Sequence, residues 1–369
     1  MLFLNRFVNI SQTMFNLTMY LLLDAFIDIG FPEVYEVFSN FIANWKWPGR
    51  LHSTFLHEIF ADDRKKKHRD AKHIKCQASD GLSLIAVAAH FVVSVLLNLK
   101  KLGKTTRDCD AECYAFLALC DLVDLIVAAS RMRVAPDKLL TSVETFLDLF
   151  EKAWGIEWMT PKFHWLLHIP NQLRMFGFLM ACFCLERKHR VPKRYATDVT
   201  HPSQNSSKTL LMETSSHHLG QLIAPNAFNF SLGLVNGSRP SKRILQVISN
   251  ALEIDQDGGD AASILVAKET RFRSVATCFA KDVILFKDGA GSFRAGVAEL
   301  HCEVHGVAIT LISAYNLSKL EPHGYSVWKV FEAPDQLYKF IETDQILDTV
   351  VYSELPNGNL GILLPLEYR

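Results

Sequence analysis

Two short segments near the middle of the chain carry the residue types that bind metal ions. The first contains two histidines four residues apart, which would lie on one face of a helix. The second follows within residues 181–190 and adds two cysteines and a further histidine. Imidazole and thiolate groups are ordinary protein ligands of zinc, although this spacing matches no standard zinc site. The alternative is that the histidines line a helix packing surface. The candidate ligands are His164, His168, Cys182, Cys184 and His189.

Glu186 lies between the second cysteine and a run of cations. An acidic side chain after an apolar helix and beside Lys and Arg suits a carboxylate that holds Mg²⁺ or Mn²⁺ next to a phosphate backbone. The alternative is a solvated helix end in which Glu186 pairs with its own arginines, and the spacing alone favours this alternative.

Cations gather in short stretches although the whole chain is balanced. Its 369 residues include 39 Lys and Arg and 39 Asp and Glu, which excludes a uniformly basic protein that coats nucleic acid. The stretches nevertheless predict local phosphate binding, and the first also fits a nuclear-import signal. The alternative is that they are solvated faces. The predicted nucleic-acid contacts are Arg64, Lys65, Lys66, Lys67, Arg187, Lys188, Arg190, Lys193 and Arg194, with a third cluster at Arg239, Lys242 and Arg243.

Several common catalytic motifs are missing from the sequence. It has no GxxxxGK[ST], GxGxxG, GxSxG or HExxH segment, so nucleotide hydrolysis, dinucleotide redox chemistry, serine hydrolysis and zincin proteolysis have no motif support. The eight scattered cysteines and the lack of a secretory signal predict a protein that is not secreted. The apolar stretch 82–99 carries His90, Ser94 and Asn98, which favours a buried helix over a membrane span.

Hydrophobic periodicity predicts an α+β fold in which two kinds of structure follow one another. Residues 1–200 show helical spacing, 201–260 form a polar connector with a short helix, and 261–369 alternate like short strands of a small antiparallel barrel. Helices are expected at 15–27, 34–45, 79–101, 111–130 and 136–154, with a restart at Pro161. Strands are expected at 283–286, 293–300, 307–312, 325–330, 349–352 and 361–366.

The segment Lys162-Phe-His-Trp-Leu-Leu-His-Ile-Pro, followed by Gly177 and by Cys182-Phe-Cys-Leu-Glu-Arg-Lys-His-Arg with Lys193-Arg194-Tyr195, resembles the C-terminal region of CACTA-type (En/Spm-like) transposases. The resemblance covers about residues 1–200. It implies an RNase H-like core whose Asp-Asp-Glu metal triad is interrupted by a helical insertion before the final glutamate. Glu186 is the position that matches this glutamate.

The chain departs from that family in its other two acids. The second aspartate of the family lies in an Asp-x-Met-His-like segment, which this sequence does not contain. Asp24 and Asp28 are poor substitutes because both lie within an apolar, helix-like run. One carboxylate cannot hold two metal ions. The resemblance therefore implies a truncated, transposon-derived, nuclear protein that binds nucleic acid without cleaving it alone.

Two other functions remain open. In the first, the chain is a Mg²⁺- or Mn²⁺-dependent DNA endonuclease in which Glu186 acts with Asp24, Asp28 or Asp62. In the second, it is a non-enzymatic interaction module whose domain after residue 260 binds a protein partner. That domain is similar to SH3-like or BAH-like barrels in the rhythm of its strands, which is an analogy of fold only.

Overall fold

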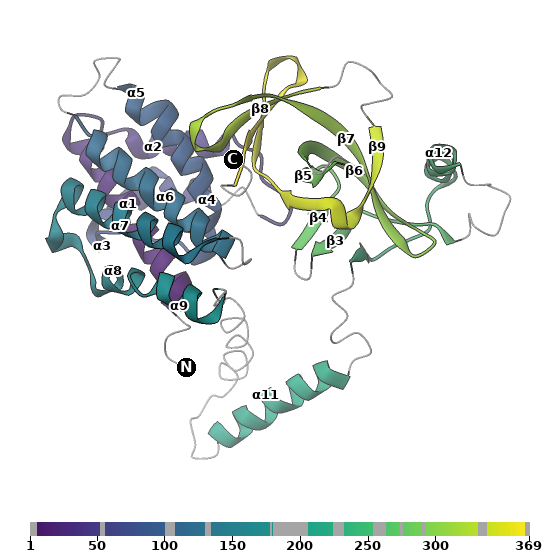
Figure 1. Ribbon diagram of the computed structural model, residues 1–369, viewed down its shortest axis with the longest axis horizontal. Helices are drawn as coiled ribbons and strands as arrows, with labels where there is room; N and C mark the ends of the chain where they lie inside the picture. Colours follow the sequence, from purple (N-terminus) through teal and green to yellow (C-terminus); the bar gives the residue numbers. More distant parts are fainter. Residues whose placement is uncertain are drawn as a thin grey trace. The chain divides into compact units, whose positions relative to one another are not determined.

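The computed structural model describes residues 6–51, 56–99, 108–129, 134–177, 179, 206–223, 232–253, 263–273, 276–288, 292–330 and 338–365. It confirms an α+β protein, with helices in the first part and antiparallel sheet in the last (Figure 1). The chain divides into two compact units. The helical unit comprises Met1–Glu36 and Ala61–Asn229, and the β unit comprises Val37–Phe60 and Phe230–Arg369.

The helical unit is built around α1, which packs against α4, α6 and α8, while α7 packs against α6 and α9. The helix α11 belongs to the same unit but comes later in the sequence, after residue 200. The bounds are α1 (Arg6–Asp28), α3 (Asp62–Ala71), α4 (Ala78–Phe91), α5 (Leu97–Leu99), α6 (Asp110–Ala129), α7 (Pro136–Trp154), α8 (Pro161–Leu166), α9 (Ile169–Phe176) and α11 (Ser206–Ile223). The helix α2 (Val34–Ala43) crosses the boundary between the units.

The predicted limits of α7 are confirmed at both ends. Pro136 occupies the first turn, where its missing N–H costs nothing, and Gly155 follows the last residue with a positive φ of 87°. Val143, Phe146 and Phe150 recur at helical spacing and are fully buried. The rings of Phe146 and Phe150 contact the ring of Phe163 on α8, with centroid distances of 6.0 and 4.5 Å. Apolar spacing and local caps therefore agree for this helix.

The apolar stretch predicted as a buried helix forms α4, a π-helical turn at Val92–Leu96, and α5. In the described part of the chain, Ser79–Leu99 is the stretch long and apolar enough to cross a membrane, and half of it is buried inside the structure. Leu84 and Phe91 are completely buried. The helix begins earlier than predicted, because Gln77 precedes its first turn and donates its N–H to Asp80 at 3.2 Å.

The β unit contains a long antiparallel sheet that forms a curled half-barrel. Its strand order is β10-β5-β6-β7-β8-β12-β11, while β2 and β9 pair with the same long strands β6 and β7. A second sheet has the order β1-β3-β4. The bounds are β1 (Gly233–Val235), β2 (Leu265–Ala267), β3 (Glu269–Arg273), β4 (Ala276–Phe279), β5 (Val283–Lys287), β6 (Phe293–Val304), β7 (Val307–Leu320), β8 (Tyr325–Val330), β9 (Tyr338–Glu342), β10 (Ile346–Thr349), β11 (Tyr352–Glu354) and β12 (Leu360–Leu363).

The hairpin between β6 and β7 turns through His305 and Gly306. Both residues have positive φ, 52° and 79°, which is the requirement of a two-residue hairpin turn that follows the sheet twist. The strand predicted at 349–352 is wrong. There β10 ends at Thr349 and β11 begins at Tyr352, because Val350 turns into the core and donates its N–H to the Val283 carbonyl at 3.0 Å.

Both faces of the central strands are covered by apolar side chains. One core lies on the side that carries Trp328, Leu285 and Ile362. A second core, around Phe286 and Ile312, fills the opposite side. A third core lies beneath α12 (Lys242–Leu252), a helix in the stretch predicted as a polar connector. β5, whose first four residues are all buried, contributes to the first two cores from opposite sides, which explains its continuous apolar sequence Val283–Phe286.

Residues 37–60 belong to the β unit, whereas the sequence placed them with the helical region 1–200. Lys46 and Tyr352 exchange two backbone hydrogen bonds, of 2.7 and 3.0 Å, so this segment continues the edge of the sheet beyond β11. The N–H of Gly49 donates to the Asp282 carboxylate at 2.8 Å. Burial raises the pKa of Asp282, and the N–H groups of Phe279 and Gly49 act against this rise.

Candidate nucleic-acid interface

The basic segment after residue 61 forms a helix, α3, that is held to the helical unit by a buried histidine. His68 is only 1% exposed and stacks on Tyr35 of α2, with ring centroids 6.1 Å apart and planes 15° from parallel. Its Nδ1 accepts the backbone N–H of Lys75 at 3.0 Å. The ring thereby connects α3, the chain that follows it and α2. A histidine among lysines would be read as part of a charged run, but here it is the anchor of the helix.

A polar cluster around Asp24 adds a second attachment. The Arg69 guanidinium lies 3.4 Å from the Asp24 carboxylate, and the Tyr20 hydroxyl donates to the same group at 3.4 Å. Burial raises the pKa of Tyr20 and of Tyr35, and the negative charge of Asp24 raises both further. The Asp24 carboxylate therefore faces the hydroxyl of Tyr20 and the guanidinium of Arg69. Arg69 is the cation that balances it.

Two further cations of the segment contact their own unit. The Lys65 ammonium donates to the Pro32 carbonyl at 2.8 Å and lies 5.8 Å from the centre of the Tyr35 ring. The Lys72 ammonium lies 5.9 Å from the centre of the Trp158 ring. Such cation–π contacts stabilise by about 0.5 to 1 kcal/mol at exposed sites. Part of the positive charge of this segment is therefore used for structure.

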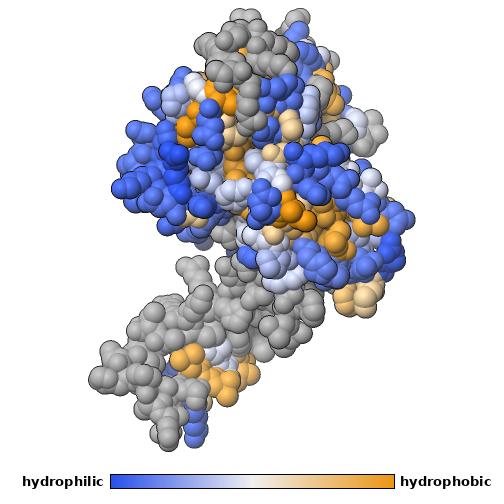
Figure 2. All heavy atoms as spheres, turned by 90° about the vertical axis from the view of Figure 1, so that its left-hand side faces the viewer, coloured by the Kyte–Doolittle hydropathy of each residue, from blue (hydrophilic) through white to orange (hydrophobic). Residues whose placement is uncertain are grey.

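The remaining cations of α3 face the solvent. Arg64, Lys66 and Lys67 are exposed. Figure 2 views the molecule from the side on which Figure 1 draws α3, and the coloured surface there carries large hydrophilic areas with hydrophobic patches between them. Residues 62–75 contain seven Lys and Arg against three Asp, so the segment keeps a net positive charge. Asp62 and Asp63 are in the first turn, where the helix dipole favours anions. They also stand four residues before Lys66 and Lys67, a spacing that allows weak ion pairs.

The two predicted histidine ligands do come together. His164 on α8 and His168, which precedes α9, have their Nε2 atoms 3.2 Å apart, and both side chains are exposed. This closeness follows from their spacing of four residues. Among the residues that the structure describes, no group of three or more His, Cys, Asp or Glu side chains could hold a metal ion. A zinc site at this pair stays a prediction.

The other half of the predicted site lies outside the described residues. This applies to Glu186 and to all its neighbours between residues 180 and 200. The residues concerned are Cys182, Cys184, Glu186, Arg187, Lys188, His189, Arg190, Lys193 and Arg194. The acids proposed to act with Glu186 are described. Asp24 contacts Arg69 and Tyr20, Asp28 is exposed at the end of α1, and Asp62 is exposed in the first turn of α3.

The third basic cluster belongs to the β unit and surrounds the start of α12. Arg239, Lys242 and Arg243 are all exposed, and the last two open the helix. Ser241 caps this helix, because its hydroxyl accepts the N–H of Ile244 at 3.4 Å. Sequence reasoning found the three cations and predicted a short helix within 201–260, but it did not place that helix at these cations. The signal was available, since Ser241 precedes a run with apolar residues at helical spacing.

Comparison with known proteins gives no relative for this arrangement. No family model matches the chain, and no curated protein and no solved structure matches it.

Proposed function

We propose that the protein binds nucleic acid through exposed cations on helices that are anchored to each unit. The observation that carries the proposal is the docking of α3: His68 is buried and stacked, so the exposed Lys66 and Lys67 are presented from a fixed helix. Cations held in place lose less conformational entropy on binding than cations on a mobile tail. The contact would be with phosphates, whose capture releases counterions.

The transposase-like origin is part of this proposal. It rests on the resemblance of the segment from Lys162 to Tyr195, including Glu186 at the position of the last catalytic acid. The RNase H-like core and the nuclear location are proposed on the same ground. Binding without cleavage is favoured because the sequence lacks the family's Asp-x-Met-His-like segment and because Arg69 already pairs with Asp24.

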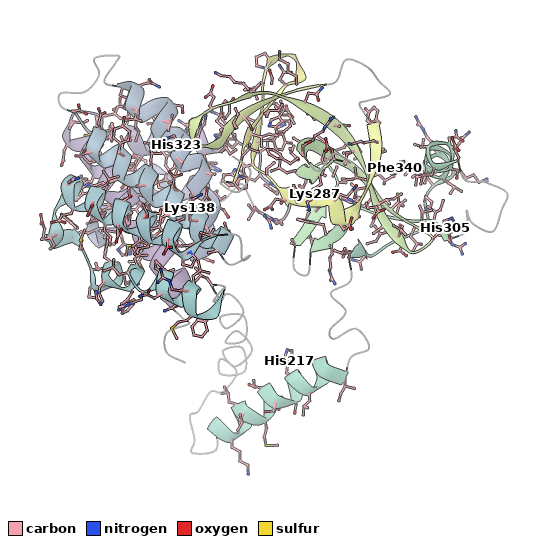
Figure 3. The ribbon with its side chains drawn as sticks, in the orientation of Figure 1. Lys138, His217, Lys287, His305, His323 and Phe340 are labelled. Atoms are coloured by element: carbon pink, nitrogen blue, oxygen red, sulfur yellow. The ribbon has the colours of Figure 1, made fainter. Side chains whose placement is uncertain are left out.

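The test compares two double variants of the full chain. Lys66→Gln with Lys67→Gln removes two cations of α3, and Lys138→Gln with Lys152→Gln removes two exposed cations of α7, where Figure 3 marks Lys138. Affinity for a duplex is measured by fluorescence anisotropy across a salt series. Each lost phosphate contact lowers the salt dependence, the slope of log K against log salt, by about 0.9. We expect the α3 variant to lose roughly two in slope and the α7 variant to match the wild type.

Two results would contradict the proposal. One is equal loss in both double variants, which would mean that only total charge matters. The other is wild-type binding that does not change with salt, which phosphate contacts cannot give. A nicking assay with Mg²⁺ or Mn²⁺, using Glu186→Gln as the control, separates binding from cleavage. We expect no nicking from either protein.

A further inference from the structure

The helix α12 has one buried face that fixes its orientation in the β unit. Ile248 is fully buried, and its apolar neighbours pack with it over the far half of the β6–β7 hairpin and β9 (Figures 1 and 3). In Figure 3 the labelled Phe340 lies on β9 next to this helix. The helix residues in the cluster are Ile244, Leu245, Ile248 and Leu252, and they meet Cys302, Val304, Ile309 and Phe340. Because this face is occupied, the opposite face must point to solvent.

That opposite face carries Arg243, Gln246, Val247 and Asn250, and all four are exposed. They stand at positions i, i+3, i+4 and i+7, so they form one stripe along the helix. Arg pairs with guanine, Gln and Asn pair with adenine, and an apolar side chain contacts the methyl group of thymine in the major groove. The stripe therefore holds the side-chain types that distinguish base pairs by their major-groove edges.

The charge at the N-terminal end of this stripe has one sign, whereas Glu253 follows the other end of the helix. Residues 232–252 contain three cations, Arg239, Lys242 and Arg243, and no Asp or Glu. Two of them lie in the first turn of α12, where the helix dipole disfavours cations and favours anions. Cations at these positions destabilise the isolated helix, but they become favourable when a phosphate lies at its N-terminal end. A locally unfavourable choice of this kind is expected at a functional surface.

The chain that leads into α12 is held in place before any ligand binds. Ser238 and Val266 exchange two backbone hydrogen bonds of 2.8 Å, which ties the residue before Arg239 to β2. The cap by Ser241 then fixes the first turn. The cations at the start of the helix therefore project from ordered backbone, as binding without a large entropy cost requires.

We propose that α12 enters the major groove of double-stranded DNA, where Arg243 and Gln246 contact base edges while Arg239 and Lys242 contact phosphates. This inference rests on the proposed function and adds a ligand class, a groove and a sequence readout. The helix has 11 residues and so is about 16 Å long. The major groove of B-DNA, about 12 Å wide, admits an α-helix. The deep, narrow major groove of A-form RNA does not, so duplex DNA is the ligand to which the inference commits.

The experiment uses the full chain and begins with selection of duplexes from a random-sequence DNA pool. Affinity for the selected duplex and for a scrambled one is then measured for wild type, Arg243→Gln, Gln246→Ala and the control Lys329→Gln. Lys329 is an exposed cation on β8, outside the cluster under α12. We expect Arg243→Gln to weaken binding to the selected duplex about tenfold and to relax selection at one position, since a bidentate pair with a base is lost. Gln246→Ala should relax selection at one position and leave the salt slope unchanged, and Lys329→Gln should stay within about twofold of wild type.

The outcomes separate this inference from the proposed function. If the Arg243 and Gln246 variants keep the affinity and the selected sequence of wild type while the Lys66 and Lys67 variant loses binding, the readout by α12 is overturned and the proposed function stands. Wild type that selects no sequence, or that binds duplex RNA as tightly as duplex DNA, also overturns the readout. Wild type that binds no nucleic acid overturns both. Arg243 and Gln246 are exposed, so unchanged thermal melting of the variants confirms that folding is not the cause.

Discussion

The helices α3 and α12 are both basic, but they are attached to their units in opposite ways. α3 is held by polar groups, namely the buried His68, the Arg69–Asp24 pair and the Lys65 contact with the Pro32 carbonyl. α12 is held by apolar side chains under Ile248. Because the attachment of α3 is polar, two of its own cations, Lys65 and Arg69, make contacts within the helical unit. Among the contacts that the structure describes, the side chains of Lys242 and Arg243 on α12 make no hydrogen bond or ion pair.

A count of cations is therefore a poor measure of a binding surface. Residues 62–75 carry more than twice as many Lys and Arg as residues 232–252, yet they include three Asp, whereas the second stretch includes no acid. A mixed surface with many weak pairs attracts phosphate less than its cation count suggests. The comparison predicts that α3 supplies affinity without sequence preference and that α12 supplies the preference.

The largest expected effect comes from loss of the apolar attachment of α12. Ile248→Ala removes a fully buried side chain and should lower the free energy of unfolding by 2 to 5 kcal/mol. Urea unfolding of the full chain and hydrogen exchange of the α12 amides measure it. Val247→Ala is the matched control, because Val247 is 51% exposed and its loss should cost less than about 0.5 kcal/mol. Similar effects of the two variants would mean that α12 is not anchored by this face.

We expect the β unit to lose stability as the pH is lowered. His301 is fully buried beside Thr310, with its Nδ1 2.9 Å from the Thr310 hydroxyl, and burial lowers its pKa to about 4 while the Phe279 backbone acts against this. The unfolded chain takes up the proton near pH 6.5, so the unfolded state binds more protons than the folded state between pH 6.5 and 4. Stability is complete above pH 6.5 and should fall by about 3 kcal/mol as the pH is lowered to 4.

Denaturant unfolding at several pH values, followed by tryptophan fluorescence, to which the buried Trp328 of the β unit contributes, measures this loss. His301→Gln serves as the control, because glutamine keeps a polar side chain but does not titrate. The variant should be less stable at neutral pH and lose less on acidification. A wild-type and a variant curve with the same slope between pH 6.5 and 4 would assign the acid sensitivity to other groups.

The sequence predicts those elements of the fold in which local signals agree. The limits of α7 are met because a proline start coincides with the apolar pattern, and the limits of β8 are those of the alternating pattern at 325–330. α3 was not expected as a helix, since a run of charges has no apolar face and its docking residue, His68, is polar. Residues 37–60 were assigned to the wrong region, because the pairing of Lys46 with Tyr352 links parts of the chain that are far apart in sequence.

In the candidate site, too, local features could be predicted from the sequence, whereas contacts between distant parts of the chain could not. The closeness of His164 and His168 could be predicted, because a spacing of four residues determines it within a helical segment. The availability of the cations could not be predicted. The partners of Lys65, Arg69 and Lys72 come from three other parts of the helical unit. A local sequence pattern does not predict such tertiary contacts. The sequence alone does not predict the exposed stripe on α12, because its orientation follows from the burial of the opposite face of the helix.

Because α3 is held by polar groups that include His68, we expect replacement of His68 to cause a loss of stability smaller than the largest expected for Ile248→Ala and larger than that for the Arg69–Asp24 pair. His68→Ala removes the stack on Tyr35 and leaves the Lys75 N–H without its acceptor, which should cost about 2 kcal/mol. Hydrogen exchange of the α3 amides should accelerate in the same variant. His73→Ala is the control, because His73 is exposed on the same segment. If His73→Ala destabilises α3 equally, the buried ring is not what holds the helix.

The smallest expected effect tests whether Arg69 is a structural cation. Arg69 is half exposed, so its pair with Asp24 should contribute only about 0.5 kcal/mol, and a double-mutant cycle of Arg69→Gln and Asp24→Asn measures this coupling. In the DNA-binding assay Arg69→Gln should lower affinity less than Lys67→Gln, because the Lys67 side chain is exposed and free of the Asp24 pair. An equal loss of affinity would show that Arg69 leaves Asp24 to contact phosphate. The polar attachment of α3 would then be released on binding, and the contrast with α12 would hold only for the unbound protein.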